Sequence, residues 1–546
     1  MSKQVSFFLN GRPVTVEDPS PDLLLIDYLR SPEVALAGPK KPCGQGGCGG
    51  CTVILSGWNE KKGRAEHRAI NSCLRPVLAL EGLVVTTVEG TGAARRPNPP
   101  YLTYSATHFR TAALPESTQP AQPALVEAQE AANAKRLEVI KKANKANKTT
   151  APLTAKLREE VTDYPSEFSH EGMNPVAHRL AMNNGTQCGY CTVGFVMNMS
   201  EFIVNNPKAT KREIEDIFDG NLCRCTGYRS ILTGMKTFAS NWTEEDKKHQ
   251  MKCKGDEAAE FQVPTKNVVI PFPPEAQAPA SGVTLDAGSR RWVTPKSLAE
   301  LAQLMRQHQG EKLRLVHANT SYGIYKEEYL ETELFLDIRL IPELNTAFQL
   351  TLTGLRVGAG ITYSELIRVL ERTMLDRGEA KPQKDGETLY AETTRLGATR
   401  FMARRTAGRI VRNAASLGGN TMLVLKHIAG TAEPFPSDAF TALAAIDAEL
   451  EYLDIRQGEG AQPQRRTVQE LVEQVVATPA LADALVLLAY HLPFGKRGEL
   501  VLAQKVALRD VNAHSILNGT SRLQLSKSLQ VEEAVLVFGG VAPYPW

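Results

Sequence analysis

The sequence lacks any run of apolar residues that approaches the ~20 needed for a membrane-spanning helix. Its first residues, MSKQVSFFLNGRPVTVEDPS, lack the long apolar core of a secretory signal and the Arg-rich, acid-poor character of a transit peptide. A large charge excess is also missing, because the formal net charge is only +3 over 546 residues. These absences predict a cytoplasmic protein with no membrane span, and they argue against a nucleic-acid partner.

Cysteine is too scarce for a disulfide scaffold, with nine in the whole chain. In a cytoplasm that keeps thiols reduced, clustered cysteines more often bind metal or carry out redox chemistry. Two clusters are present, and the remaining cysteine, Cys253 in MKCKGDEAAE, is predicted to be a free thiol in a linker. The chain length predicts three or four domains at ~100–200 residues each.

The first cluster lies in PCGQGGCGGCTVILS and has the pattern C-x4-C-x2-C followed by a distant fourth cysteine. This is the spacing of a plant-type [2Fe–2S] ferredoxin, with Cys43, Cys48, Cys51 and Cys73 as ligands. The loop must bend so that backbone N–H groups face the cluster, and glycine permits such bends. The glycines of the loop are Gly44, Gly46, Gly47, Gly49 and Gly50. Zinc is the alternative, although structural zinc sites favour two C-x2–4-C pairs.

The residues around this loop predict strands and one helix. Residues 5–17 read as a hairpin that turns at Asn10 and Gly11. Residues 22–30 have the spacing of a helix, and residues 51–57 that of a strand leaving the cysteine loop. A ferredoxin-like β-grasp domain would account for all of these features.

The second cluster consists of Cys188 and Cys191 in QCGYC and of Cys223 and Cys225 in NLCRC. Residues 193–206 and 211–220 between the two pairs have helical spacing, so each pair lies beside a helix end, where an N-terminus favours thiolate. Taken alone, this pattern is compatible with zinc. Beside a ferredoxin motif it predicts a second iron–sulfur cluster.

Two such motifs in this order resemble the molybdenum hydroxylases, the family of xanthine dehydrogenase and aldehyde oxidase. The matching segments are CGQGGCGGCTV, TTVEG, QCGYCTVGFVMNM and GNLCRCTGYR. In that family a β-grasp [2Fe–2S] domain precedes a four-helix [2Fe–2S] domain, an FAD domain and a large molybdopterin domain. The resemblance implies that the first cysteine set binds the cluster nearer the flavin and the second set the cluster nearer the molybdenum. It also implies that Gln187 contacts the pterin.

The resemblance continues from about residue 290 to the end of the chain. LRLVHANTSYGIY and RIVRNAASLGGNT are similar to the family's two flavin-phosphate loops, in which backbone amides and small hydroxyls hold a pyrophosphate. Asp438 falls where the family places an aspartate on the flavin's polyol, and Lys505 is a further flavin contact that the resemblance suggests. The loop residues implied as FAD contacts are Val316, Asn319, Thr320, Ser321, Ser416, Gly418, Gly419 and Asn420.

The sequence also departs from the family. Ala318 stands where glycine is usual, Ser321 where an acidic residue is common, and Thr406 where an aromatic ring often faces the isoalloxazine. The segment 93–172 is an insert, Pro-rich and then Ala- and Lys-rich, interpreted either as disorder with one solvated helix or as a docking arm for another subunit. The match stops before the molybdopterin domain, so we assign no catalytic residue to this chain.

We therefore predict an α+β fold. Its expected parts are a plant-type β-grasp domain (1–92), the insert (93–172), a four-helix [2Fe–2S] domain (173–245), a linker (246–289) and an FAD domain of the vanillyl-alcohol-oxidase type, truncated at its C-terminus (290–546). The implied function is electron relay from a molybdenum centre, in a missing domain or partner chain, through two [2Fe–2S] clusters to FAD and then NAD or O₂. The alternative is a non-catalytic accessory subunit of a larger complex, which the insert would grip. Such a subunit would keep the fold, with or without the clusters, but would lack FAD.

Overall fold

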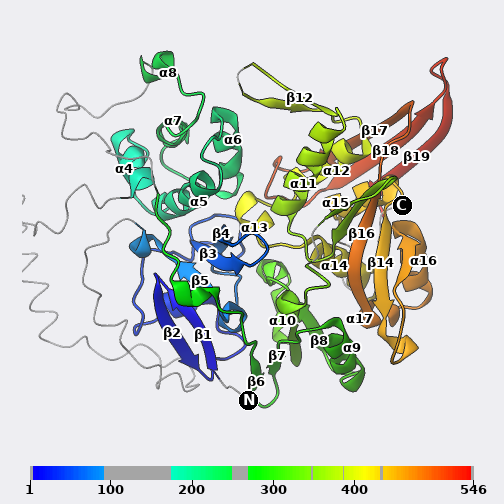
Figure 1. Ribbon diagram of the computed structural model, residues 1–546, viewed down its shortest axis with the longest axis horizontal. Helices are drawn as coiled ribbons and strands as arrows, with labels where there is room; N and C mark the ends of the chain where they lie inside the picture. Colours follow the sequence, from blue (N-terminus) through cyan, green and yellow to red (C-terminus); the bar gives the residue numbers. More distant parts are fainter. Residues whose placement is uncertain are drawn as a thin grey trace, which may run out of the picture.

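The computed structural model describes residues 4–91, 174–248, 268–345, 348–384, 386–430 and 435–542 (Figure 1). Helices and sheets occupy these ranges together, in agreement with the predicted α+β class. No helix of the described ranges is long and apolar enough to cross a membrane. The predicted insert 93–172, Cys253 and the centre of the predicted linker lie outside the described residues.

The N-terminal region is a five-stranded sheet with one short helix, at the lower left of Figure 1. Its elements are β1 (Gln4–Leu9), β2 (Arg12–Glu17), α1 (Leu25–Leu29), β3 (Thr52–Asn59), β4 (Arg64–Asn71), η1 (Val77–Leu80), β5 (Val84–Thr86) and η2 (Val88–Gly90). The strand order is β2-β1-β5-β3-β4, with β1 and β5 parallel. The predicted hairpin is confirmed, with Asn10 and Gly11 at φ of 52° and 81°. The predicted helix begins only at Leu25, because Leu24 pairs with Pro76 in a β-bridge.

Helices make up the second region, at the upper left of Figure 1. They are α4 (Pro175–Met182), α5 (Thr192–Asn205), α6 (Lys211–Asp216), η6 (Ile217–Gly220), α7 (Arg229–Lys236) and α8 (Glu244–Lys248). Helix α5 confirms the prediction for 193–206, is buried from Gly194 to Ile203, and packs against β3 and β4 of the first region. The predicted helix 211–220 is α6 followed by η6, and it begins with a capping box between Thr210 and Glu213.

The third region begins with a four-stranded sheet in the order β6-β7-β9-β8, in which β7, β9 and β8 are parallel. Its elements are η8 (Pro274–Gln277), β6 (Thr284–Asp286), β7 (Arg291–Val293), α9 (Leu298–Gln307), β8 (Leu313–Val316), η9 (Thr320–Gly323), α10 (Lys326–Leu330), β9 (Leu334–Asp337) and η10 (Ile338–Leu340). Trp292 and Phe335 are fully buried in one core shared with the N-terminal sheet. The two regions therefore pack as one body.

A second, antiparallel sheet of the third region has the order β10-β11-β16-β14-β15. Its strands are β10 (Gln349–Leu350), β11 (Gly354–Gly358), β14 (Glu449–Asp454), β15 (Gln464–Thr467) and β16 (Leu485–Pro493). The neighbouring elements are α11 (Tyr363–Asp376), β12 (Ala380–Pro382), β13 (Thr388–Tyr390), α12 (Arg395–Arg405), α13 (Arg409–Arg412), α14 (Leu417–Ala429), α15 (Asp438–Ala445), η11 (Ile455–Gln457), α16 (Val468–Ala477) and α17 (Leu481–Ala484). The main core lies between this sheet and the helices, with Phe440 and Tyr490 fully buried.

The described chain ends in a three-stranded antiparallel sheet, β17 (Glu499–Val506), β18 (Leu517–Leu525) and β19 (Val531–Gly539), drawn in orange to red in Figure 1. Its inner face packs on α12 and α15 and carries polar residues such as Asn518 and Arg522. Its outer face exposes apolar residues, among them Leu502, Leu536 and Phe538. The loop between β17 and β18 returns to the junction of the three regions, where the candidate sites lie.

Candidate cofactor sites

The first cysteine loop runs from α1 to β3 and holds Cys43, Cys48 and Cys51, while Cys73 follows β4. The structure brings these four predicted ligands together as two pairs. The sulfurs of Cys51 and Cys73 lie 3.3 Å apart and are buried at 1% exposure, and Cys43 pairs with Cys48 nearer the surface. Within the described residues, no set of three or more Cys, His, Asp or Glu side chains is grouped around one metal position. A pairwise arrangement suits a cluster of two irons, because each iron then takes two of the four thiolates.

Hydrogen bonds in this loop favour the thiolate form of Cys43 and Cys51, the form that binds iron, whereas the hydrogen bonds to these two thiols and burial raise the pKa of Cys48 and Cys73. The backbone N–H of Gln45 donates to Cys43 Sγ at 3.3 Å, and Asn71 Nδ2 donates to Cys51 Sγ at 3.5 Å. A hydrogen bond from the Cys48 thiol lowers the pKa of Cys43 to about 5. The hydrogen bond between Cys51 and Cys73 lowers the pKa of Cys51 to about 7, although burial acts in the opposite direction.

The second cysteine set lies at two helix starts. Cys191 is the N-cap of α5, and Cys223 and Cys225 precede α7. The sulfurs interact as the pairs Cys188 with Cys225 and Cys191 with Cys223. Burial would raise the pKa of Cys223, but hydrogen bonds from Thr226 outweigh it and lower this pKa. The set again offers two pairs of thiols.

Gln187 is exposed beside Cys188, at the surface of the helical region. It does not line the large cavity described below. Its predicted contact with a pterin therefore requires a group that approaches from outside this chain, and it stays a prediction.

The two cysteine loops touch through their backbones. The N–H of Leu222 donates to the carbonyl of Cys48 at 3.0 Å. Helix α5 meets the first loop at Gly194, where an added Cβ would lie 2.2 Å from the carbonyl oxygen of Gly49. Such close approach is available only without a side chain at that position. The two candidate cluster sites are thus neighbours.

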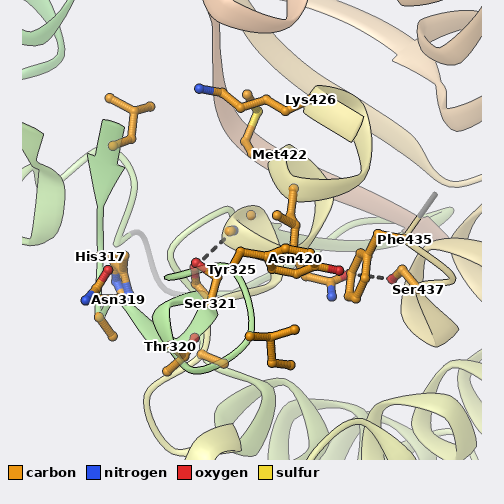
Figure 2. A pocket seen from close by; sticks show the side chains of 18 of the residues that line it. His317, Asn319, Thr320, Ser321, Tyr325, Asn420, Met422, Lys426, Phe435 and Ser437 are labelled. Carbon is orange, nitrogen blue, oxygen red and sulfur yellow. Dashed lines mark hydrogen bonds between the residues drawn. The ribbon is translucent and has the colours of Figure 1, made fainter. Parts of the chain in front are cut away.

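A cavity of about 430 Å³ lies in the third region, a volume ordinary for a small-molecule or cofactor site. Figure 2 shows its wall, with residues from the loop after β8 facing residues of α14 and the segment before α15. Most of the predicted FAD contacts line it: Asn319, Thr320, Ser321, Ser416, Gly418, Gly419, Asn420 and Asp438. The prediction for Val316 is not supported, because its side chain is buried in the core with Trp292 rather than lining the cavity.

The N-terminus of α14, called the cradle below, lies in the wall of this cavity, where the helix dipole favours negative charge, although the N–H groups of Leu417, Gly418 and Gly419 are bonded within the chain. Ser416 caps the helix by accepting from the N–H of Gly419 at 3.1 Å. Gly418 is pressed against the neighbouring strand end, with its N–H donating to Ala359 O at 2.9 Å. Asn420 accepts from Ser437 Oγ at 2.5 Å, which ties the helix to the segment before α15 (Figure 2).

The loop on the opposite wall contains two buried polar atoms without hydrogen-bond partners. Asn319 Nδ2 donates to the Leu74 carbonyl at 3.1 Å, but its buried Oδ1 has no hydrogen-bond partner. His317, which no motif in the sequence indicates, also lines the cavity and has an unpartnered Nδ1. Burial and the nearby Arg75 lower the pKa of His317 to about 4, so its imidazole is neutral at pH 7. A cavity of this size with a helix N-terminus and polar side chains in its wall fits a cofactor with phosphates and other polar groups, as FAD has.

Asp438 is anchored from several sides. Its Oδ2 accepts from Lys505 Nζ at 2.7 Å, and its Oδ1 accepts from Asn518 Nδ2 at 2.9 Å and from the Ser515 hydroxyl. Lys505 is not among the residues that line the cavity, since its ammonium is also held by the carbonyls of Arg405 and Ala513. The prediction of a direct flavin contact by Lys505 is therefore not supported. Its role here is to hold the Asp438 carboxylate in place.

The positions that depart from the family, Ala318, Ser321 and Thr406, all line the cavity. Ser321 Oγ accepts from Arg314 Nη2 at 2.6 Å, so this hydroxyl is engaged by a side chain of the preceding strand. Aromatic rings enter the same wall from elsewhere, since Tyr325 and Phe435 line the cavity with ring centroids 6.1 Å apart. No local pattern in the sequence identifies these two rings as cavity residues.

The first cysteine loop itself forms part of the cavity wall, through Gln45, Gly46 and Gly47. Gly46, at φ 80°, packs against Val411 of α13, to which an added Cβ would lie 3.2 Å away. The loop that holds the first cysteine set is thus in direct contact with the candidate flavin site.

Three domain families match the sequence. Residues 7–78 match the 2Fe-2S iron-sulfur cluster binding domain, 165–236 the [2Fe-2S] binding domain, and 286–494 the FAD binding domain in molybdopterin dehydrogenase. These matches agree with the positions of the two cysteine sets and of the cavity.

Relatives with curated functions match over nearly the whole chain. Xanthine dehydrogenase/oxidase of Gallus gallus is 29% identical, and the match covers 99% of this chain and 35% of the relative. Aldehyde oxidase 1 of Oryctolagus cuniculus is 27% identical, and the match covers 99% of this chain and 35% of the relative. A solved structure of carbon monoxide dehydrogenase from Hydrogenophaga pseudoflava aligns with 47% of this chain and 77% of its own, at 16% identity and a TM-score of 0.35. The chain spans about a third of the length of the two curated relatives.

The matches and the geometry lead to the same assignment. Each matched cluster domain contains one complete set of four cysteines, and the matched FAD domain contains both loops that line the cavity. The chain therefore combines two [2Fe-2S] domains with an FAD-binding domain of the molybdopterin dehydrogenase type, and over nearly its whole length it is similar to the corresponding portion of xanthine dehydrogenase and aldehyde oxidase.

Proposed function

We propose that this chain carries electrons from a molybdenum centre outside it to FAD. The order of sites would be the second cysteine set, the first cysteine set and then the flavin cavity. The observation that carries this proposal is that the first cysteine loop contacts both other sites. The backbone N–H of Leu222 in the second loop donates a hydrogen bond to the carbonyl of Cys48, and Gly47 lies in the wall of the flavin cavity. Bound [2Fe–2S] clusters would supply one-electron transfer, and bound FAD would collect two electrons.

The residues of this chain would prepare each site for that role. Backbone N–H groups and Asn71 favour the thiolates that ligate iron, and packing of α5 on the first loop keeps the two sites adjacent. The N-terminus of α14 would bind the pyrophosphate, and the anchored Asp438 would face the polyol. The accessory alternative without FAD is less well supported, because the cavity is present and both predicted flavin loops line it.

The finer domain assignments are part of this proposal. We assign a β-grasp fold to 1–92, a four-helix fold to 173–245 and a vanillyl-alcohol-oxidase-type fold to 290–546, with 93–172 as an insert and 246–289 as a linker. The mixed sheet with parallel β1 and β5 supports the first of these assignments. The central, buried α5 supports the second.

The partner would be a molybdopterin-binding domain or subunit, which would meet the helical region where Gln187 and Cys188 are exposed. NAD or O₂ would accept the electrons from FAD, and the cytoplasm would be the site of action. A purine or an aldehyde would be the substrate class, by analogy with the named relatives.

Anaerobic purification followed by iron, acid-labile sulfide, flavin and molybdenum analysis tests this function. Two [2Fe–2S] clusters predict about four irons per chain, with one FAD. Substrate added to the complex with a molybdenum-containing partner should reduce clusters and flavin together. Iron without flavin would instead support the accessory role, and absence of iron from anaerobic preparations would contradict both.

Gly418→Ala is expected to weaken FAD binding about tenfold and to leave the iron content unchanged. The added Cβ would lie 2.7 Å from Ala359 O, so the N-terminus of α14 must shift out of the cradle. Overpacking of this kind costs ~1–3 kcal/mol, and 1.4 kcal/mol is tenfold in affinity. The measurement is the flavin-to-iron ratio and the FAD dissociation constant of the purified chain.

Gly397→Ala is the matched control for this substitution. Gly397 lies in the first turn of α12, where Thr394 accepts from its N–H, and an added Cβ would lie 2.0 Å from Ala391 O. This residue does not line the cavity, so its substitution should lower stability without a selective loss of flavin. Equal flavin-to-iron ratios in the two variants would contradict the cradle assignment.

A further inference from the structure

Asn512 lies in the loop between β17 and β18 and reaches three parts of the molecule at once. Its side chain lines the flavin cavity. Its Nδ2 donates to the carbonyl of Asp219 at 2.8 Å and lies 3.4 Å from the carbonyl of Gly47. Gly47 belongs to the first cysteine loop, and Asp219 lies just before the second. One amide group therefore connects both candidate cluster sites to the flavin site.

Glycines make the space in which this amide sits. At Gly408, just before α13, an added Cβ would lie 3.0 Å from both Nδ2 and Oδ1 of Asn512 and 2.6 Å from Cα of Gly220. The backbone of Asn512 is left-handed, at φ 54°, which asparagine tolerates better than most residues. The position thus combines an unusual backbone conformation with contacts to distant segments.

The neighbouring contacts hold the same junction but do not reach all three sites. The carboxylate of Asp219 accepts a hydrogen bond from the backbone N–H of Arg409 at 2.7 Å. It also forms an ion pair with the guanidinium of Arg412. Neither of these arginines lines the cavity. Asn512 alone, among the residues that line the cavity, donates to the segment before the second cysteine pair.

We infer that Asn512 is a positioning residue for electron transfer, which fixes the first cysteine loop relative to both the second loop and the flavin. This inference rests on the proposed relay. Electron-transfer rates fall steeply with the separation of the centres, so a residue that locks two loops against the flavin cavity controls the rate without taking part in the chemistry. Removal of the amide should loosen the junction while leaving ligands and cradle in place.

Asn512→Gly is the test, because glycine keeps the left-handed backbone and removes only the side chain. In the purified chain with clusters and FAD bound, the clusters are reduced by a one-electron photochemical donor and flavin reduction is followed. A displacement of about 1 Å can cost up to 10²-fold in a geometry-dependent step, so we expect flavin reduction to slow by about tenfold. Asn512→Asp, which keeps the shape but places an anion against two carbonyls, should slow it as well.

A second readout is the magnetic interaction between the two reduced clusters in the electron paramagnetic resonance spectrum. It should weaken or change in both variants, while iron and FAD contents stay at the wild-type level. A general loss of stability would not change this interaction in the folded protein.

Asp510→Ala is the control in the same loop, since Asp510 pairs with Arg405 at 2.9 Å at the surface and is not a cavity residue. It should behave as wild type. Wild-type rates and spectra in Asn512→Gly and Asn512→Asp would overturn the inference, and so would a selective loss of FAD. Failure of reduced clusters to reduce FAD in the wild-type chain would contradict the relay itself.

Discussion

Cys48→Ser is expected to remove one of two [2Fe–2S] signals and about two of four irons per chain. Cys48 is one of four thiols that form two pairs in the first loop, and its hydrogen bond stabilises the thiolate of Cys43. Cluster ligation also supplies folding energy, because the ligands converge only in the folded loop. We therefore also expect a lower unfolding temperature for the N-terminal region. Electron paramagnetic resonance, iron analysis and thermal unfolding measure the three effects.

Cys253→Ser is the control for that result. It changes the ninth cysteine, which lies outside both sets and is predicted to be free. Iron content and spectra should match those of the wild type. Two intact signals in Cys48→Ser would show that the first loop does not bind a plant-type cluster, and zinc would become the metal to analyse.

Arg409→Met is expected to lower the free energy of unfolding by about 3–5 kcal/mol. Arg409 of the flavin region forms an ion pair with Glu201 of α5 at 2.7 Å, with the two side chains 9% and 1% exposed. Its Nη1 also donates to Asn198 Oδ1 at 2.7 Å. Loss of the guanidinium removes the ion-pair partner of the buried Glu201 carboxylate, which keeps only a hydrogen bond from Asn205 and the charge of Arg368 nearby. Denaturant unfolding, followed by fluorescence and by cluster absorbance, measures the loss.

The double variant Arg409→Met/Glu201→Gln separates the lost ion pair from lost packing. Because it removes both charges, it should recover much of the stability, as a double-mutant cycle would detect. Arg372→Met is the surface control, since its pair with Asp376 is 73% and 51% exposed and is expected to contribute under ~1 kcal/mol. Similar losses for Arg372→Met and Arg409→Met would contradict the proposed importance of burial.

The sequence predicts the local features of this fold well. The hairpin at Asn10 and Gly11, the helix α5 and both cysteine sets depend on residues that are close together in the chain or spaced in a recognisable way. Such patterns reflect backbone preferences and ligand chemistry, which act over short distances. The helix α1 is shorter than predicted because a residue far along the chain, Pro76, pairs with Leu24.

The flavin site could be predicted only in part. Loop residues such as Ser416 and Asn319 line the cavity as expected, but Val316 does not. Val316 is buried in the core with Trp292, although Arg314, Leu315 and His317 beside it all line the cavity. Lys505 and Asn512 depend on contacts with segments far away in sequence, and no local pattern encodes them.

The contact between Gly49 and Gly194 restricts how this sequence can change over evolution. The two cysteine loops adjoin because each lacks a side chain at this point, and an added Cβ on Gly194 would lie 2.2 Å from Gly49 O. Neither position can accept even an alanine without moving a loop. A drift to larger residues here would separate the cysteine sets while every ligand stayed intact, so two positions that bind no iron also limit the proposed relay.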